Sequence, residues 1–112
     1  MEDMKKVLAE LDSNLKKFAK EYPEQTNAFF GFMGAVEKEG ALDKKTKELI
    51  AIALSVVQKC HWCIAYHVDS ALKEGATKDE IMESAYVAVL MGGGPALAYS
   101  QYVKKALDDL KK

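Results

Sequence analysis

Apolar residues recur every three or four positions along almost the whole of this 112-residue chain. That spacing places them on one face of an α-helix, and no run shows the alternation of every second residue that is typical of a half-buried strand. The length suits one domain, so we expect a single domain over residues 1–112. The sequence therefore predicts an all-α fold, a single-domain bundle of about six short helices.

Capping and stop residues predict where the first three helices begin and end. The first helix covers roughly residues 7–18, and Pro23 suits the first turn of a second helix, which Gly40 ends. Asp43 is a good N-cap for a third helix, which runs to about residue 58. This third segment is apolar nearly all round, so we expect it to be buried on most sides.

The second half of the chain carries equally clear signals. A fourth helix ends near Gly75, and Thr77 with Glu80 forms a capping box that starts a fifth. The Gly-Gly-Gly-Pro run at residues 92–95 interrupts the pattern, which predicts a separate sixth helix over residues 95–110. The third and fifth helices are apolar enough to suggest that they also form subunit contacts.

Composition restricts the partners and the location of the protein. Hydrophobic residues make up 49% and charged residues 29%, as in soluble globular proteins. Sixteen basic and seventeen acidic residues give a net charge of -1 without a basic stripe, which argues against a nucleic-acid partner. The longest apolar run, residues 49–57, is far shorter than the roughly 20 residues that span a membrane. Because no targeting segment is visible, we expect a cytoplasmic protein.

A Cys-x-x-Cys sequence is the chemical centre of the chain. Thiols are kept reduced in the cytoplasm, so Cys60 and Cys63 indicate catalysis or metal binding more than a structural disulfide. Cys63 and His67 are four residues apart and share one face of the fourth helix. The imidazole can take the thiol proton, and the helix N-terminus stabilises a thiolate. One thiolate could attack an oxidant, and the other cysteine could then close a disulfide.

Glu48 is the third candidate, although it precedes Cys60 by twelve residues. If the chain reverses near residues 58–59, the third and fourth helices pack antiparallel, and Glu48 and His67 become level with each other. The predicted order is then a carboxylate that orients a base, the base beside a thiol, and a second thiol beyond it.

Other interpretations of these residues were compared with this one. The two cysteines and two histidines could bind zinc, but they all lie within eight residues, whereas structural zinc sites usually draw on two separated pairs. A non-enzymatic redox sensor and a structural oligomer with vestigial cysteines also fit the sequence. A thioredoxin fold does not, because no βαβ pattern surrounds the cysteines. We expect neither a bound metal nor a bound cofactor.

The complete spacing resembles a known signature. The order Glu48, eleven residues, Cys60, two residues, Cys63, three residues, His67 is similar to that of the alkylhydroperoxidase-D-like (carboxymuconolactone decarboxylase) superfamily. The resemblance extends over roughly residues 29–102. Further matching positions are Leu42-Asp43, Lys47-Glu48-Leu49-Ile50, Ala71, Gly75-Ala76-Thr77, Glu80-Ile81 and Gly92-Gly93-Gly94-Pro95.

The resemblance implies thiol-dependent reduction of hydroperoxides in an all-α homo-oligomer, a trimer or a hexamer. It assigns Cys63 as the peroxidatic cysteine and Cys60 as the resolving cysteine, and it places Glu48 and His67 in a proton relay. An external dithiol, such as a lipoyl- or thioredoxin-like reductant, would reset the pair.

This chain departs from that family's pattern at one position. Members with the best-known activity carry a relay histidine directly before the second cysteine, where this chain has Trp62. His61 is one place earlier and remains a candidate relay group, but a shift of one residue turns a helical side chain by about 100°. Trp62 is expected to serve packing or an interface.

The superfamily also contains decarboxylases that act on a cyclic lactone acid, and this lyase activity is the alternative enzymatic function. Such enzymes generally lack the cysteine pair, and this chain contains no arginine for bidentate recognition of a dicarboxylate. The predicted function is therefore a peroxidase or related disulfide redox enzyme.

Overall fold

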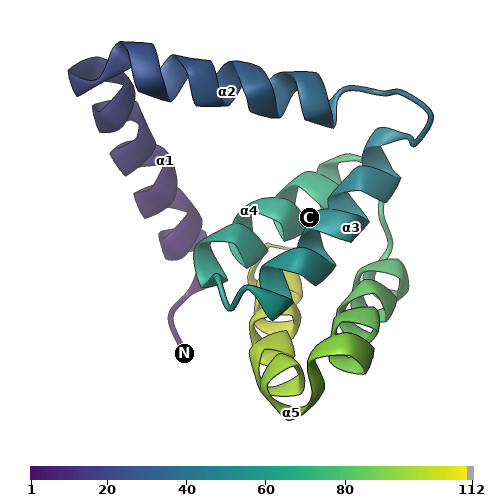
Figure 1. Cartoon of the computed structure of the whole chain (residues 1–112). Helices are drawn as coiled ribbons and strands as arrows, with labels where there is room; N and C mark the ends of the chain where they lie inside the picture. The colour runs from purple at the N-terminus through teal and green to yellow at the C-terminus, as the bar shows by residue number, and fades with distance from the viewer. Residues whose placement is uncertain (111–112) are drawn as a thin grey trace.

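The computed structural model describes residues 1–110, and their regular structure is entirely helical, as predicted. The helices are α1 (Met4–Glu21), α2 (Pro23–Glu37), α3 (Lys44–Val57), α4 (His61–Lys73) and α5 (Lys78–Leu110). The helices α3, α4 and α5 pack against one another, whereas α1 leads away from this bundle and α2 leads back to it (Figure 1). The first two helices thus form an arm on the bundle.

The core lies between α3, α4, α5 and the start of α1. Its largest fully buried side chains are Met4, Val7, Ile52, Val56, Ile64, Val68, Ile81 and Val103. In contrast, none of the residues of α2, all of which the structure describes, is buried. The bundle is therefore held by apolar packing, and α2 depends on contacts at its ends.

The predicted helix starts are confirmed by the hydrogen bonds of their caps. Pro23 occupies the first turn of α2. The Asp43 carboxylate accepts a hydrogen bond from the Thr46 N–H at 2.8 Å, which satisfies one free donor of α3. The predicted capping box is also present, because the Thr77 N–H donates to Glu80 (2.8 Å) and the Glu80 N–H donates to the Thr77 hydroxyl (3.1 Å).

A tight reversal joins α3 to α4 at the place where the sequence predicts it. Lys59 adopts a left-handed conformation with a φ of 58°. The N–H groups of Lys59 and Cys60 donate to the carbonyl oxygens of Val56 and Ser55, both at 3.1 Å, which caps the end of α3. The two helices therefore run antiparallel, with Cys60 directly before α4.

The predicted break at residues 92–95 is confirmed. Helix α5 consists of two helical segments that meet at Gly93, whose φ of 69° and ψ of -150° L-residues rarely adopt, and the second segment corresponds to the predicted sixth helix. Pro95 follows in the first turn after the bend, where its missing N–H costs little. A Cβ at Gly92 would lie 3.1 Å from Val57, so α5 passes close to the end of α3 here.

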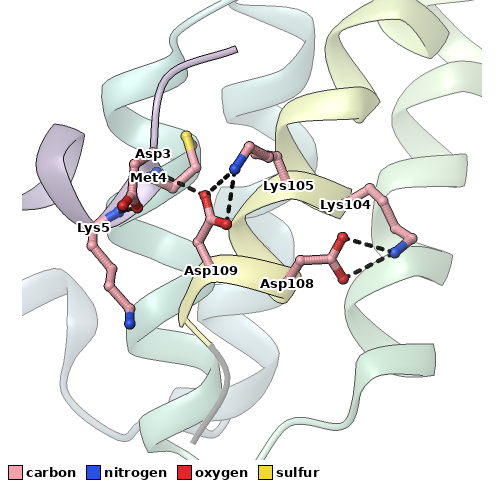
Figure 2. A network of polar contacts seen from close by, with 7 residues as sticks. All are labelled: Asp3, Met4, Lys5, Lys104, Lys105, Asp108 and Asp109. Carbon is pink, nitrogen blue, oxygen red and sulfur yellow. Dashed lines mark hydrogen bonds and ion pairs between the residues drawn. The ribbon is translucent and has the colours of Figure 1, made fainter.

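The beginning of α1 is attached to the end of α5 by a polar network (Figure 2). The Met4 N–H donates to an Asp109 oxygen at 2.9 Å, and the Lys105 ammonium group pairs with the same carboxylate at 2.8 Å. Both contacts lower the pKa of Asp109 below its usual range, and the hydrogen bond from Lys105 has the larger effect. The network fixes the base of the arm to the bundle.

One outer face of the bundle remains apolar and exposed. The sequence predicts burial on most sides of α3, but Ile50 and Leu54 are 45% and 57% exposed, since no other part of the described chain covers them. Leu90 and Met91 of α5 are each 80% exposed. By length and composition α5 could span a membrane, but this is weak evidence because core helices of soluble proteins pass the same test.

Candidate active site

Cys60 and Cys63 form a disulfide at the N-terminus of α4, with their Cα atoms 5.3 Å apart. Cys60 is the N-cap residue of the helix, and its sulfur accepts a hydrogen bond from the Cys63 N–H at 3.2 Å. The pair is therefore placed at the positive end of the α4 dipole, which favours negative charge on a sulfur atom after reduction.

Glu48 and His67 meet across the α3–α4 pair. The His67 Nδ1 atom lies 2.8 Å from the Glu48 Oε1 atom, and only 9% of the Glu48 side chain and 20% of the His67 side chain are exposed. The Tyr66 ring is perpendicular to the His67 ring, with 5.0 Å between their centres. The carboxylate thus fixes the orientation of the imidazole, which is the usual way of preparing a histidine for proton transfer.

A cavity of about 430 Å³ lies between the arm and the bundle and contains these groups. Its polar or reactive residues are Glu37, Lys47, Glu48, Cys63, Tyr66 and His67. The rest of its wall is apolar and consists of Leu11, Leu15, Phe29, Phe32, Met33, Val36, Ala51 and Trp62. The volume is within the range of small-molecule sites, and the wall favours a ligand with an apolar part.

The structure adds two residues that the sequence analysis missed. Glu37, the last residue of α2, has one oxygen that lies within 4.8 Å of a Glu48 oxygen and of a His67 ring nitrogen. Lys47 donates hydrogen bonds to the carbonyl oxygens of Val36 (2.8 Å) and Lys38 (2.7 Å), and so fastens the end of α2 to α3. A carboxylate at a helix C-terminus opposes the helix dipole, and this unfavourable position was the signal available in the sequence.

The predicted site residues divide into two groups in space. Cys63, Glu48 and His67 line one cavity, and Cys60 is bonded to Cys63 at its edge. His61 lies elsewhere: its ring stacks on Tyr102 with 5.6 Å between the centres, and its Nε2 atom is 3.9 Å from a Glu2 oxygen. The structure therefore does not bring His61 to the Glu48–His67 pair, and the neighbouring Trp62 lines the cavity in its place.

The same carboxylates and imidazole are close enough to be considered as metal ligands. Glu37, Glu48 and His67 each offer one atom, all within 4.8 Å of one another. Glu48 and His67 already contact each other through Oε1 and Nδ1 at 2.8 Å. That pairing is the arrangement expected of a carboxylate that orients a base.

Comparisons with known proteins agree with this fold. The carboxymuconolactone decarboxylase family matches residues 23–103. A carboxymuconolactone decarboxylase family protein from Legionella pneumophila superposes with a TM-score of 0.94 at 41% identity, over 97% of each chain. An uncharacterized protein of the cox locus of Paracoccus denitrificans is 44% identical over 75% of this chain and 76% of its own length.

A more distant relative has a named activity. The alkyl hydroperoxide reductase AhpD of Corynebacterium kroppenstedtii is 34% identical over 61 residues, which are 54% of this chain and 34% of that protein. The family match covers most of the chain, and the Legionella structure superposes over nearly its whole length. The chain therefore belongs to the carboxymuconolactone decarboxylase family.

Proposed function

We propose that this protein reduces organic hydroperoxides through the Cys60–Cys63 pair. One observation carries the proposal: Cys63 lines an apolar cavity together with the hydrogen-bonded Glu48–His67 pair. A thiol, an oriented base and a space for an apolar group are the parts that such a reaction requires. The similarity to an alkyl hydroperoxide reductase over about half of the chain supports it.

The proposed reaction uses the two thiols as the reducing equivalents. His67 takes the proton of the Cys63 thiol, and the thiolate attacks the terminal oxygen of the hydroperoxide. The O–O bond breaks, which leaves a sulfenic acid on Cys63 and releases the alcohol after protonation. The Cys60 sulfur then attacks the Cys63 sulfur, so that a disulfide forms and water leaves. An external dithiol returns the pair to the reduced state.

The position of each cysteine supports these separate roles. Cys63 is among the residues that line the cavity, whereas Cys60 forms the N-cap of α4 at its edge. A substrate in the cavity would therefore meet the Cys63 sulfur first. This chemistry requires no further cofactor, since both electrons come from the thiols.

A lyase acting on a dicarboxylate is less well supported by the same cavity. Lys47 is the cation among its lining residues, and its ammonium group already donates to two carbonyl oxygens of the α2 end. Two carboxylates of the protein, Glu37 and Glu48, would repel an anionic substrate.

The test is the intact mass and metal content of the reduced protein, before and after one equivalent of cumene hydroperoxide. Loss of about two mass units with consumption of the peroxide is expected, because two thiol hydrogens are removed. Bound zinc with no disulfide would favour a metal-binding module. Unchanged, metal-free thiols would contradict the proposed peroxidase.

We further propose that the exposed apolar face of α3 and α5 joins copies of this chain into a trimer or hexamer. Leu90→Glu is expected to reduce the assembly to single chains, because it places a charge beside the exposed side chains of Val87 and Met91 on α5. Light scattering coupled to gel filtration measures the mass. Leu42→Glu, an equally drastic change at a 47% exposed leucine outside that face, is the control. A wild-type protein that is monomeric at micromolar concentration would refute this interface.

A further inference from the structure

Glu37 brings a second carboxyl group to the site from a different helix. One of its oxygens, a Glu48 oxygen and a His67 ring nitrogen all lie within 4.8 Å of one another. Glu37 also lines the cavity that contains Cys63. Lys47 donates to the carbonyl oxygens of Val36 and Lys38, on either side of Glu37, so two hydrogen bonds fix the backbone that carries this carboxyl group.

Two carboxylates at this distance compete for negative charge. Partial burial raises the pKa of Glu37, the nearby charge of Glu48 raises it further, and His67 opposes both effects. The C-terminal end of α2 adds partial negative charge from its carbonyl groups. The Glu37 carboxyl group therefore holds its proton more readily than an isolated glutamate does.

The other charged groups around Glu37 do not remove this effect. Lys47 caps α2, while Lys16 and Lys73 pair with Asp12 and Asp69 at 3.0 and 2.9 Å. The remaining titratable groups that share a cavity with Glu37 are Lys38 beyond α2, Lys44 on α3, Tyr66 on α4, and Glu74 directly after α4. Burial and the charges of Glu37 and Glu48 raise the pKa of Tyr66 as well, so it stays neutral.

We infer that Glu37 is the proton donor to the leaving oxygen, which deepens the proposed peroxidase function and rests on it. When the Cys63 sulfur bonds to the terminal oxygen of a hydroperoxide, the O–O bond breaks and its electron pair remains on the other oxygen. That alkoxide takes the proton from the Glu37 carboxyl group and leaves as the alcohol. Glu37 becomes a carboxylate, and the proton that His67 took from Cys63 restores it through Glu48.

Leaving groups of different basicity test this role. An alkoxide from tert-butyl hydroperoxide needs a proton, whereas the carboxylate that leaves from a peroxycarboxylic acid does not. Glu37→Gln keeps the shape and removes the acid, so it should slow oxidation of Cys63 by tert-butyl hydroperoxide about 100-fold or more and oxidation by peracetic acid by less than about threefold. Single-turnover disulfide formation, measured at one pH below neutrality, gives both rates.

Two further readouts separate proton donation from a structural effect. Alkylation of Cys63 by iodoacetamide should keep its rate in Glu37→Gln, since the thiolate forms through His67. With tert-butyl hydroperoxide the wild-type rate should fall as the pH rises through the raised pKa of Glu37, and the variant should lack this decline. Glu39→Gln, at an exposed position two residues further on, is the charge-matched control and should behave as wild type.

The outcomes distinguish this inference from the proposed function beneath it. Equal slowing of both oxidants in Glu37→Gln, or no slowing of either, would overturn the role of Glu37 while peroxidase activity stands. A normal peracetic acid rate shows in the same experiment that the variant is folded. A wild-type protein that reacts with neither oxidant would overturn the proposed function and this role together.

Discussion

Cys63→Ser is expected to abolish hydroperoxide consumption completely. The serine hydroxyl is far less acidic and less nucleophilic than the thiol, and it cannot be oxidised to a sulfenic acid. The remaining Cys60 lies at the N-cap of α4 and is not among the residues that line the cavity. Peroxide consumption under excess dithiol, followed by a colorimetric peroxide assay, should fall to the rate of the dithiol alone.

Cys60→Ser is the matched variant, and it should still react with peroxide once but form no disulfide. Cys63 still attacks, so one equivalent of peroxide is consumed, but no resolving thiol follows. Intact mass should increase by about 16 units, the mass of one oxygen on sulfur, instead of decreasing by about two. If the two variants behave in the opposite way, the assignment of the attacking and resolving cysteines is reversed.

Glu48→Gln is expected to slow turnover by about 100-fold, within the usual range for the loss of acid–base catalysis. Glutamine fits the same buried place, 7% exposed, and can still accept a hydrogen bond from His67. It cannot stabilise the positive charge that the imidazole gains when it takes the Cys63 proton. The midpoint pH of Cys63 alkylation should therefore shift upward.

Glu83→Gln provides the comparison for this measurement, because it removes the same charge from an exposed position on α5. Circular dichroism should show the same helix content for both variants. An alkylation profile that is unchanged in Glu48→Gln would remove Glu48 from the mechanism.

Local sequence signals were sufficient to predict most helix ends. Asp43, Thr77 and Glu80 make the cap hydrogen bonds that the sequence predicts, because caps depend on residues only two or three apart. The break within α5 was predicted from the Gly-Gly-Gly-Pro run at residues 92–95, but the single residue at which it falls was not. A run of three glycines does not reveal that only Gly93 leaves the helical conformation while its neighbours continue the helix on either side.

The site was predictable where it depends on two helices joined by a short turn. The reversal at Lys59 makes α3 and α4 antiparallel, and this register brings Glu48 to His67. Glu37 could not be placed in the same way. Its position depends on the direction in which α2 returns from α1 to the bundle. It also depends on the Lys47 hydrogen bonds, which join residues nine and eleven apart.

The weak attachment of α2 has a consequence for access to the cavity. With none of its residues buried, this helix can open locally at a free energy well below that of global unfolding. Such an opening uncovers Cys63 and His67 while α3 and α4 stay packed. Amide hydrogens of α2 should therefore exchange with solvent faster than those of α3, and substrates too bulky for the closed cavity should enter at the frequency of that opening.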